Sequence, residues 1–198
     1  MFCYQCQETA KNEGCTIQGV CGKKEDTANS QDLLIYVTKG LAEVANRLGE
    51  DNEKVYDKIS KNLFVTITNA NFDTEAIFKI VKETIQMKDE LLEKVEDKEG
   101  LSDFALYSSM DDSELERKAV EVGVLNIVNE DERSLTELTT YGLKGMAAYN
   151  HHANVLGYRD VEVDRFIAKA LEETTKADKE VPNLIDLVMA TGEHGVKA

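Results

Sequence analysis

A single proline in 198 residues is the feature that most constrains the fold, because proline interrupts α-helices more sharply than any other residue. Apolar residues recur every three or four positions through most of the chain, which is the spacing of one helix face. About 42% of the residues are hydrophobic, enough for a real core at this length. We therefore predict an all-α fold. Residues 1–29 show no helical period and are predicted to form an irregular loop rich in cysteine and glycine.

Residues 30–100 are predicted to form a first three-helix bundle. Ser30 is the expected N-cap of its first helix, and Gly49 lies just past that helix's end. Asp73 is the expected N-cap of the third helix, which we extend to Gly100. The short connections favour antiparallel packing. The apolar positions of the three helices are Leu33, Leu34, Val37, Leu41, Val44, Ala45 and Leu48; Val55, Ile59, Leu63 and Ile67; and Ile77, Ile80, Val81, Ile85, Leu91, Leu92 and Val95.

Residues 101–133 are less regular and are interpreted as a linker. It contains one short predicted helix at Glu114–Val122, which Gly123 would stop. The stretch Val124–Val128 could instead be a short strand, although one strand alone cannot make a sheet.

Residues 134–198 are predicted to form a second three-helix bundle. Ser134-Leu135-Thr136-Glu137 has the form of a capping box and predicts the start of a helix that runs to Leu156. Pro182 suits the first turn of the last helix, which is expected to stop at Gly192. Gly142 and Gly145 lack a dinucleotide-binding pattern and indicate close approach of a helix or a cluster. The middle helix carries Val163, Phe166, Ile167, Ala170 and Leu171.

Charge and composition exclude several classes of protein. Acidic residues number 38 against 23 basic ones, and the net charge of −15 disfavours binding to nucleic acid. No run of about 18 apolar residues predicts a membrane-spanning helix. No basic or apolar leader is visible, so we expect a cytoplasmic location, where clustered thiols are more often metal ligands than disulfides. The acidic stretches are mostly solvated faces, with a docking patch for a basic electron donor as the weaker interpretation.

All four cysteines lie within the first 21 residues, at Cys3, Cys6, Cys15 and Cys21. Their irregular spacing favours an iron–sulfur cluster. Structural zinc is second, because zinc sites usually pair two short knuckles across a longer gap. Disulfides are disfavoured without a secretory signal, and ordinary buried cysteines would not gather at one end of the chain.

Other side chains close to the cysteines in the sequence are candidate parts of a site. Lys11, Lys23 and Lys24 could offset the charge of four thiolates, although each is more simply explained as a solvated residue. Tyr4 and Phe2 are expected to pack around the cysteines.

The three histidines, His151, His152 and His194, are not expected to be ligands. His151 and His152 are adjacent on one helix and cannot point at one site, so one is expected to face the core and one the solvent. No Glu-x-x-His signature is present, which excludes a di-iron site.

The amino-terminal motif resembles the hybrid cluster proteins, also called prismane proteins or hydroxylamine reductases. The resemblance lies in Met1-Phe2-Cys3-Tyr4-Gln5-Cys6-Gln7-Glu8-Thr9-Ala10, Gly14-Cys15 and Gly19-Val20-Cys21-Gly22. It continues through Tyr141-Gly142-Leu143-Lys144-Gly145-Met146-Ala147-Ala148-Tyr149, His152-Ala153, Leu156-Gly157 and Gly195-Val196-Lys197-Ala198. Carbon-monoxide dehydrogenases fit these motifs less well.

This resemblance implies that Cys3, Cys6, Cys15 and Cys21 hold a cubane [4Fe-4S] cluster. It also implies a helical domain of two three-helix bundles. Family members reduce hydroxylamine to ammonia and water, and nitric oxide reduction is also attributed to them. The chemistry is placed at a hybrid iron–sulfur–oxygen cluster held by a histidine, two glutamates and several cysteines of later domains. No cysteine follows Cys21, so no active-site residue is carried over to this chain.

We therefore expect an electron-entry module of a longer reductase, since the ending at Gly195-Val196-Lys197-Ala198 resembles a cut in a continuing family sequence. Its expected partners are an external electron donor protein and the hybrid-cluster domains of the full-length chain. The 198 residues alone are expected to be inactive. The alternative is a non-catalytic module for protein interaction in which the four cysteines bind zinc.

Overall fold

The computed structural model describes residues 1–9, 13–49, 51–177 and 179–198. Within these ranges the regular structure is helical, and β pairing is limited to one isolated bridge between Cys3 and Cys15. The all-α prediction is confirmed. None of the described helices is long and apolar enough to cross a membrane. The elements are η1 (Gln7–Thr9), α1 (Glu25–Leu48), α2 (Glu53–Val65), α3 (Thr74–Leu92), α4 (Asp103–Leu106), α5 (Asp112–Glu121), η2 (Val124–Asn126), α6 (Glu130–Val155), α7 (Val161–Glu173) and α8 (Val181–Lys197).

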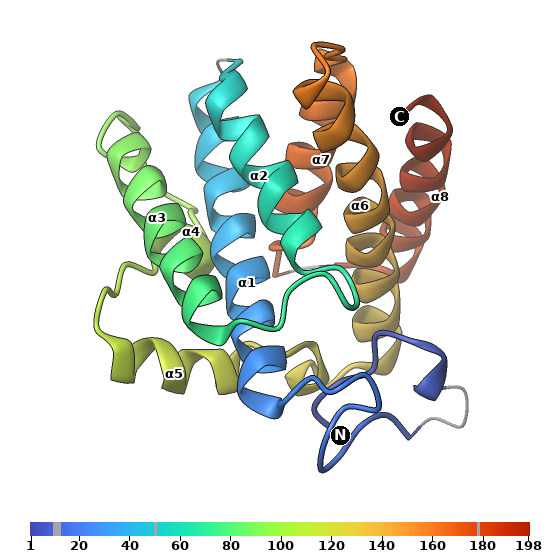
Figure 1. Ribbon diagram of the computed structural model, residues 1–198. Coiled ribbons are helices and arrows are strands. Elements are labelled where there is room, and N and C mark those ends of the chain that lie inside the picture. The colour runs from blue at the N-terminus through green and yellow to red at the C-terminus, as the bar shows by residue number, and fades with distance from the viewer. Residues whose placement is uncertain (10–12, 50, 178) are drawn as a thin grey trace.

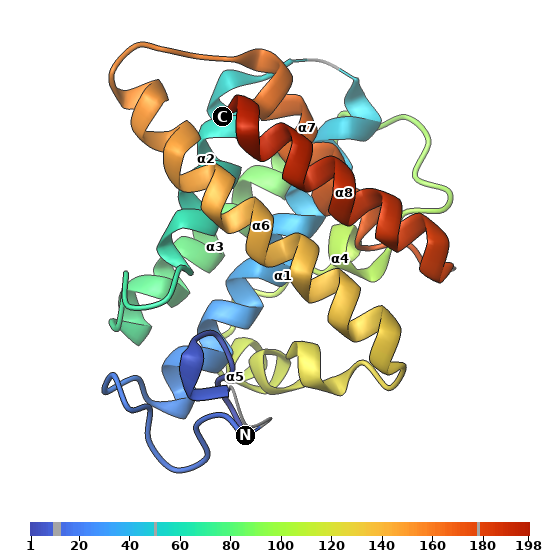
Figure 2. The same cartoon turned by 90° about the vertical axis from the view of Figure 1, so that its right-hand side faces the viewer.

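The six longer helices stand side by side, while α5 runs across one end of them (Figure 1). Helix α1 is the central element and packs against α2, α3, α4, α5 and α7. Figure 2 shows α6 and α8 crossing one side of the assembly together. In both views the amino-terminal loop lies at the same end as α5, next to the first turns of α1.

Two apolar clusters form the core. The larger one joins helices from both halves of the chain, for example Leu41 of α1, Ile59 of α2, Leu143 of α6 and Ile167 of α7. The smaller one lies between α1, α3 and α5. Because α1 packs against α7 and α2 against α6, the two predicted groups of helices share one core. Their division into separate bundles at residues 100 and 134 stays a prediction.

Several helix boundaries follow their local signals. The Asp73 carboxylate caps α3 by accepting a hydrogen bond of 3.0 Å from the Ala76 N–H. Gly49 ends α1 with a φ of 69°, a left-handed conformation that glycine adopts without strain. Pro182 lies in the first turn of α8 as predicted.

The predicted start of the first helix at Ser30 is wrong. Helix α1 begins at Glu25, so the end of the predicted loop is helical. Glu25 and Asp26 stand in the first turn, where negative charge is favourable against the helix dipole. Ser30 is fully buried, and its hydroxyl donates to the Thr27 carbonyl at 2.9 Å instead of capping the helix.

The predicted capping box at Ser134 is also wrong. Helix α6 begins at Glu130, and the Asn129 side chain accepts a hydrogen bond of 3.0 Å from the Glu132 N–H. Three acidic residues in this first turn explain the earlier start. Ser134 and Glu137 therefore lie inside the helix.

Helix ends differ from prediction in two places. Helix α3 ends at Leu92 rather than near Gly100, although Val95 in the following turn is still buried. Helix α8 continues through Gly192 to Lys197, because one glycine weakens a helix without ending it.

The linker differs from prediction as well. The stretch interpreted as a candidate strand contains a 3₁₀ turn, η2, and the Asn126 side chain donates to the carbonyls of Val120 and Glu121, each at 2.9 Å. Helix α4 was not predicted. Gly40 allows it to approach α1, since a Cβ at that position would lie 2.0 Å from the Phe104 carbonyl oxygen.

Candidate metal centre

The four cysteines lie on a loop that folds back on itself through Cys3 and Cys15. The Cys15 N–H donates to the Cys3 carbonyl at 2.9 Å, and the Phe2 N–H donates to the Cys15 carbonyl at 2.8 Å. The backbone thus brings together two cysteines that are 12 positions apart in the sequence.

Gly14 makes this pairing possible. A Cβ at this position would lie 2.1 Å from the Cys3 carbonyl oxygen, a distance that no side chain tolerates. The glycine at position 14 is therefore explained by the close approach of two segments of the loop.

The second half of the loop makes a tight turn around Cys21. The Gly22 N–H donates to the Gly19 carbonyl at 2.8 Å, and the Gly19 N–H donates to the Lys23 carbonyl at 2.8 Å. Cys21 is exposed, whereas Cys3, Cys6 and Cys15 are half-buried. The Cys6 carbonyl accepts a hydrogen bond from the Thr9 N–H at 3.1 Å.

The loop is attached to the helices at several points. The Thr68 hydroxyl, from the connection between α2 and α3, donates to the Gln5 carbonyl at 3.0 Å. Phe2 is 8% exposed and packs inward, as expected. The Lys23 ammonium donates to the Gln31 side chain of α1 at 2.7 Å.

The donor chemistry of the loop fits a cysteine-bound group. All four cysteines are free thiols. In the part of the chain that the structure describes, no three His, Cys, Asp or Glu side chains lie close enough together to hold a metal ion. The loop nevertheless supplies four sulfur donors, and its paired backbone already holds Cys3 beside Cys15. The assignment of all four cysteines as one ligand set stays a prediction.

The three lysines expected near the cysteines have different positions. Lys23 is only 1% exposed, so the interpretation of this residue as solvated surface is wrong. Lys24 is exposed, and Lys11 lies outside the described residues. No local pattern around Lys23 indicates that it is buried.

Four charged residues that sequence reasoning missed lie beside the loop. Asp32 and Lys39 are seven residues apart on α1, and Glu137 and Lys144 are seven residues apart on α6. A spacing of seven places two residues on the same face two turns apart. Charged residues at this spacing on otherwise apolar helix faces are the signal that could have found them.

Burial shifts the pKa of each of these groups toward its neutral form. It raises the pKa of Asp32 to about 7 and lowers the pKa of Lys39 to about 8. It also raises the pKa of Glu137 and lowers the pKa of Lys144. The pKa of Tyr4 is raised, first by burial and then by the charges of Asp32 and Glu137. The end of the bundle beside the cysteines therefore contains titratable groups that change charge near neutral pH.

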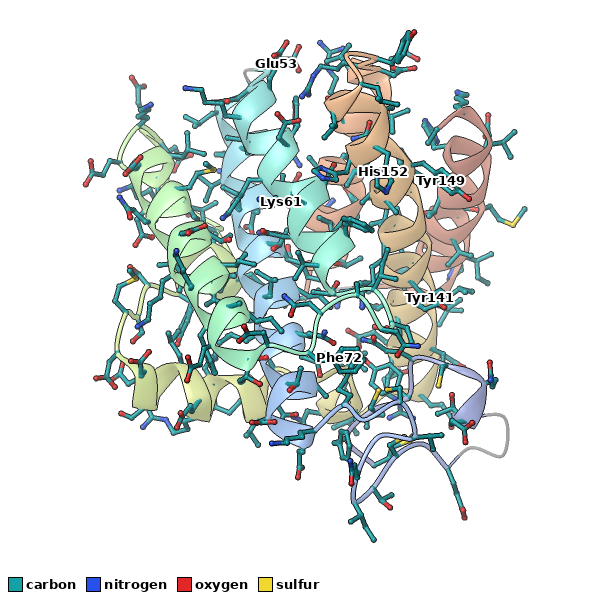
Figure 3. All side chains as sticks on the ribbon, in the orientation of Figure 1. Glu53, Lys61, Phe72, Tyr141, Tyr149 and His152 are labelled. Carbon is teal, nitrogen blue, oxygen red and sulfur yellow. The ribbon has the colours of Figure 1, made fainter. Side chains whose placement is uncertain are left out.

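The histidines lie away from the cysteine loop. His151 is half-buried and His152 exposed, and both rings contact Phe64, with centroids 5.5 and 5.2 Å away. His152 projects from α6 on the side where Tyr141 and Tyr149 are also exposed (Figure 3). His194 stacks on Phe166 with ring centroids 3.7 Å apart. These contacts are aromatic packing.

Gly142 and Gly145 differ in their surroundings. A Cβ on Gly142 would lie 2.8 Å from the Thr191 methyl group, so this glycine lets α8 pack closely on α6. Gly145 has open space around its Cβ direction. The expected close approach therefore applies to Gly142 and is wrong for Gly145.

Comparison with known proteins places the whole chain in one group. The model of the Prismane/CO dehydrogenase family matches residues 1–198. The hydroxylamine reductase of Desulfovibrio desulfuricans is 48% identical over 202 residues, covering 100% of this chain. Those of Bacteroides thetaiotaomicron and Clostridium perfringens are each 50% identical, covering 100% and 99% of it. The chain spans 37% of the length of each of these relatives. With a family match over its full length, the chain belongs to the Prismane/CO dehydrogenase family.

Proposed function

We propose that this chain is the amino-terminal, electron-entry part of a hydroxylamine reductase-like hybrid cluster protein. In this proposal Cys3, Cys6, Cys15 and Cys21 together hold a [4Fe-4S] cluster. Electrons would come from an external donor protein and pass to a hybrid cluster in the remainder of the polypeptide. The overall reaction would reduce hydroxylamine to ammonia and water, consuming two electrons and two protons.

The observation that carries the proposal is the single loop of four free thiols in a chain that matches relatives named hydroxylamine reductase along its whole length. The match covers the cysteine loop as well as the helices. Free thiols also suit a cytoplasmic location, because a reducing compartment keeps them available as ligands.

When bound, a [4Fe-4S] cluster would supply a centre that accepts and releases one electron. The chain's own residues would hold that centre and adjust its surroundings. The four thiolates would be its ligands, and the buried side chain of Phe2 would limit the access of water. The ammonium groups of Lys23 and Lys144, both buried, would offset part of the negative charge of four thiolates.

The chain's own residues also limit what it can do alone. The hybrid cluster of the family needs several further cysteines, and none follows Cys21. We therefore propose that hydroxylamine is reduced only where the remainder of a full-length polypeptide is present, and that the 198 residues alone do not turn it over.

The cluster assignment is tested by anaerobic purification followed by iron, sulfide and zinc analysis and a visible spectrum. A cubane cluster predicts about four irons and about four sulfides per chain and a broad visible absorption band. Each of Cys3→Ser, Cys6→Ser, Cys15→Ser and Cys21→Ser should lower the iron content, whereas Thr16→Ser, an exposed change of similar size on the same loop, should not. A colourless protein with one zinc per chain would instead support a zinc-binding interaction module.

The assignment of the reaction has a separate test. The iron-loaded 198-residue chain is mixed with chemically reduced viologen and hydroxylamine, and the formation of ammonia is measured. We expect the reductant to give electrons to the cluster only, with no ammonia above the level of free iron–sulfur controls. Sustained ammonia formation would show that the active site lies in these residues.

A further inference from the structure

A cavity of about 290 Å³ lies between α1 and α6, at the end of the bundle that carries the cysteine loop. Tyr4 of the loop, Phe104 of α4, the chain between α5 and α6, and Lys179 complete its wall. Segments that are distant in the sequence therefore meet around one cavity, which is partly open to solvent. Figure 2 shows α6 crossing α1, with α5 on the side of the crossing where the amino-terminal loop lies.

Two charged groups of α1 line this cavity. The Lys39 side chain is 9% exposed, and its ammonium lies over the Phe104 ring with 5.9 Å between the nitrogen and the ring centroid. Asp32 lies two turns earlier on the same helix face. Among the described residues, neither side chain has a hydrogen-bond or ion-pair partner in the protein.

The third group is a hydroxyl. Thr136 of α6 is 1% exposed and lines the cavity, and its Oγ1 has no hydrogen-bond partner among the described residues. The neighbouring hydroxyls of Thr140 and Thr174 are already bonded to backbone carbonyls, at 2.9 and 2.6 Å. Among the described residues, Thr136 is thus the threonine of this wall whose hydroxyl is left for another partner.

Buried polar groups are nearly always hydrogen-bonded, because an unpaired one loses its hydration without compensation. One such group could be a local defect. Here the Thr136 Oγ1, a buried atom without a partner among the described residues, lines the same cavity as the Lys39 ammonium and the Asp32 carboxylate. A polar occupant of the cavity would supply the hydrogen-bond partners that these groups lack within the described part of the chain.

The charges on the wall define that occupant. Glu132 and Lys179 form an ion pair at 2.6 Å, and Glu121 pairs with Lys118 at 3.4 Å, so these carboxylates are already neutralised. What remains is the ammonium of Lys39 and the carboxylate of Asp32 on α1, with the carboxylate of Glu137 on α6. The rest of the wall is largely apolar and contains Ile35, Tyr36, Phe104, Val122, Val124 and Ile127.

We propose that this cavity binds a small zwitterion with an apolar side chain, such as a neutral amino acid. Its carboxylate would accept hydrogen bonds from Lys39 and Thr136, and its ammonium would donate to Asp32 and Glu137. Its side chain would pack on Ile35 and Tyr36. The site is separate from the cysteine loop's ligand set, so it goes beyond the proposed function and does not depend on iron.

The shifted pKa values of the wall agree with this arrangement. With a pKa of about 7 for Asp32 and about 8 for Lys39, set first by burial, both groups stand close to losing their charges even though each feels the opposite charge of the other. A ligand with one charge of each sign would hold both groups ionised. The charges of Lys144, Lys23 and Glu137 also act on Asp32, and those of Lys179, Lys144 and Glu137 act on Lys39.

The test is calorimetric titration of the purified 198-residue chain with three matched probes. L-leucine carries both charges, 3-methylbutylamine lacks the carboxylate, and 4-methylpentanoate lacks the ammonium. We expect saturable binding of leucine and at least about tenfold weaker binding of the other two, since each loses one charge-assisted contact. Absence of leucine binding to the folded chain, or equal binding of all three probes, would overturn the proposal.

Two variants assign the two ends of the ligand. Lys39→Met should weaken leucine binding by about tenfold or more and leave 3-methylbutylamine unchanged. Asp32→Asn should weaken the binding of leucine and of 3-methylbutylamine. It should not weaken the binding of 4-methylpentanoate. Lys61→Met, an exposed change on α2, is the matched control and should alter nothing.

Thr136→Val provides an isosteric variant that leaves all charges in place. It should weaken leucine binding several-fold with an unchanged helical circular dichroism spectrum. Unchanged leucine affinity in both Lys39→Met and Thr136→Val would show that the carboxylate does not bind at this end of the cavity. The iron content of each sample is measured alongside, so that a failure of cluster assembly is recognised separately from a failure of ligand binding.

Discussion

The polar cluster around Asp164 and the polar cluster around Asp32 both lie between helices of this bundle, but their groups are partnered differently. Asp164 is 2% exposed and accepts hydrogen bonds from Asn150 at 2.7 Å and from Arg159 at 2.5 Å. Asn150 also donates to Ser60, at 3.0 Å. Asp32, by contrast, lines a cavity and has no such partner among the residues that the structure describes. The first cluster joins α2, α6 and α7 with its charges neutralised, whereas the second is open to a ligand.

The largest expected effect is at the partnered cluster. Asp164→Ala leaves the buried Asn150 amide and the Arg159 guanidinium without their carboxylate, so the free energy of unfolding should fall by about 3 kcal/mol. Urea denaturation measures this change. The other partner of Arg159 is Asp57, whose side chain is 52% exposed. Asp57→Ala should therefore lower the free energy of unfolding by less than about 1 kcal/mol. Equal losses in the two variants would contradict the distinction between a buried and an exposed partner.

At the unpartnered cluster, removal of a charge should have the opposite sign. The pKa of Lys39 is about 8 in the folded chain and 10.5 in the unfolded one, so below pH 8 its charge destabilises the fold. Lys39→Met should raise the free energy of unfolding by about 1 to 3 kcal/mol at pH 7. The gain should shrink as the pH rises from 8 toward 10.5, because the lysine is then neutral in the folded state. Urea titrations at pH 7 and pH 10 test the sign, and a loss of stability at pH 7 would show that Lys39 has a partner.

Asp32→Asn should give a smaller gain, because Asp32 is only half-buried. Its pKa is about 7 in the folded chain against 3.8 when unfolded, so its ionisation destabilises the fold above pH 7 and has no effect below pH 3.8. We expect a gain of about 1 kcal/mol at pH 8 and almost none at pH 4. Thermal unfolding at both pH values measures it, with the exposed Glu116→Gln as the control. A gain that is the same at both pH values would contradict a titration effect.

The smallest expected difference compares two buried threonines. Thr38 accepts a hydrogen bond from the Asn62 side chain at 3.0 Å, so Thr38→Val should lower the free energy of unfolding by about 1 kcal/mol. Thr136 has no such bond within the described part of the chain, and Thr136→Val should change the free energy of unfolding by less than about 0.5 kcal/mol or increase it. Urea denaturation in the absence of added amino acids compares the two. A cost at Thr136 equal to that at Thr38 would mean that its hydroxyl already has a partner.

Much of the helical architecture could be predicted from local signals. Periodic apolar residues predicted the six long helices α1, α2, α3, α6, α7 and α8, because burial of one face is the main source of helix stability. Asp73 and Gly49 marked boundaries correctly, since capping depends on a few neighbouring atoms. The Ser134 capping box was wrong because a competing cap at Asn129, with three acidic residues after it, begins the same helix earlier.

The cysteine donors of the candidate site could be predicted from the sequence, whereas the charged residues around them could not. Four clustered cysteines are visible in any sequence, but the burial of Lys23, Asp32 and Lys39 depends on which helix faces meet. Asp32 and Glu137 lie 105 positions apart in the sequence and line one cavity only because α1 and α6 converge beside Tyr4. No local pattern contains that information.

The contacts that hold the cysteine loop against the helices determine when, during synthesis of the chain, this loop can reach its folded position. Its first residues leave the ribosome before the rest of the chain, yet Gln5 is held by Thr68, and Tyr4 contributes to a cavity wall that includes Glu137 and Lys179. The amino terminus therefore cannot reach its final position until more than half of the chain has been synthesised and α6 has formed. Until that moment the loop that carries the four thiols lacks these contacts with the helices.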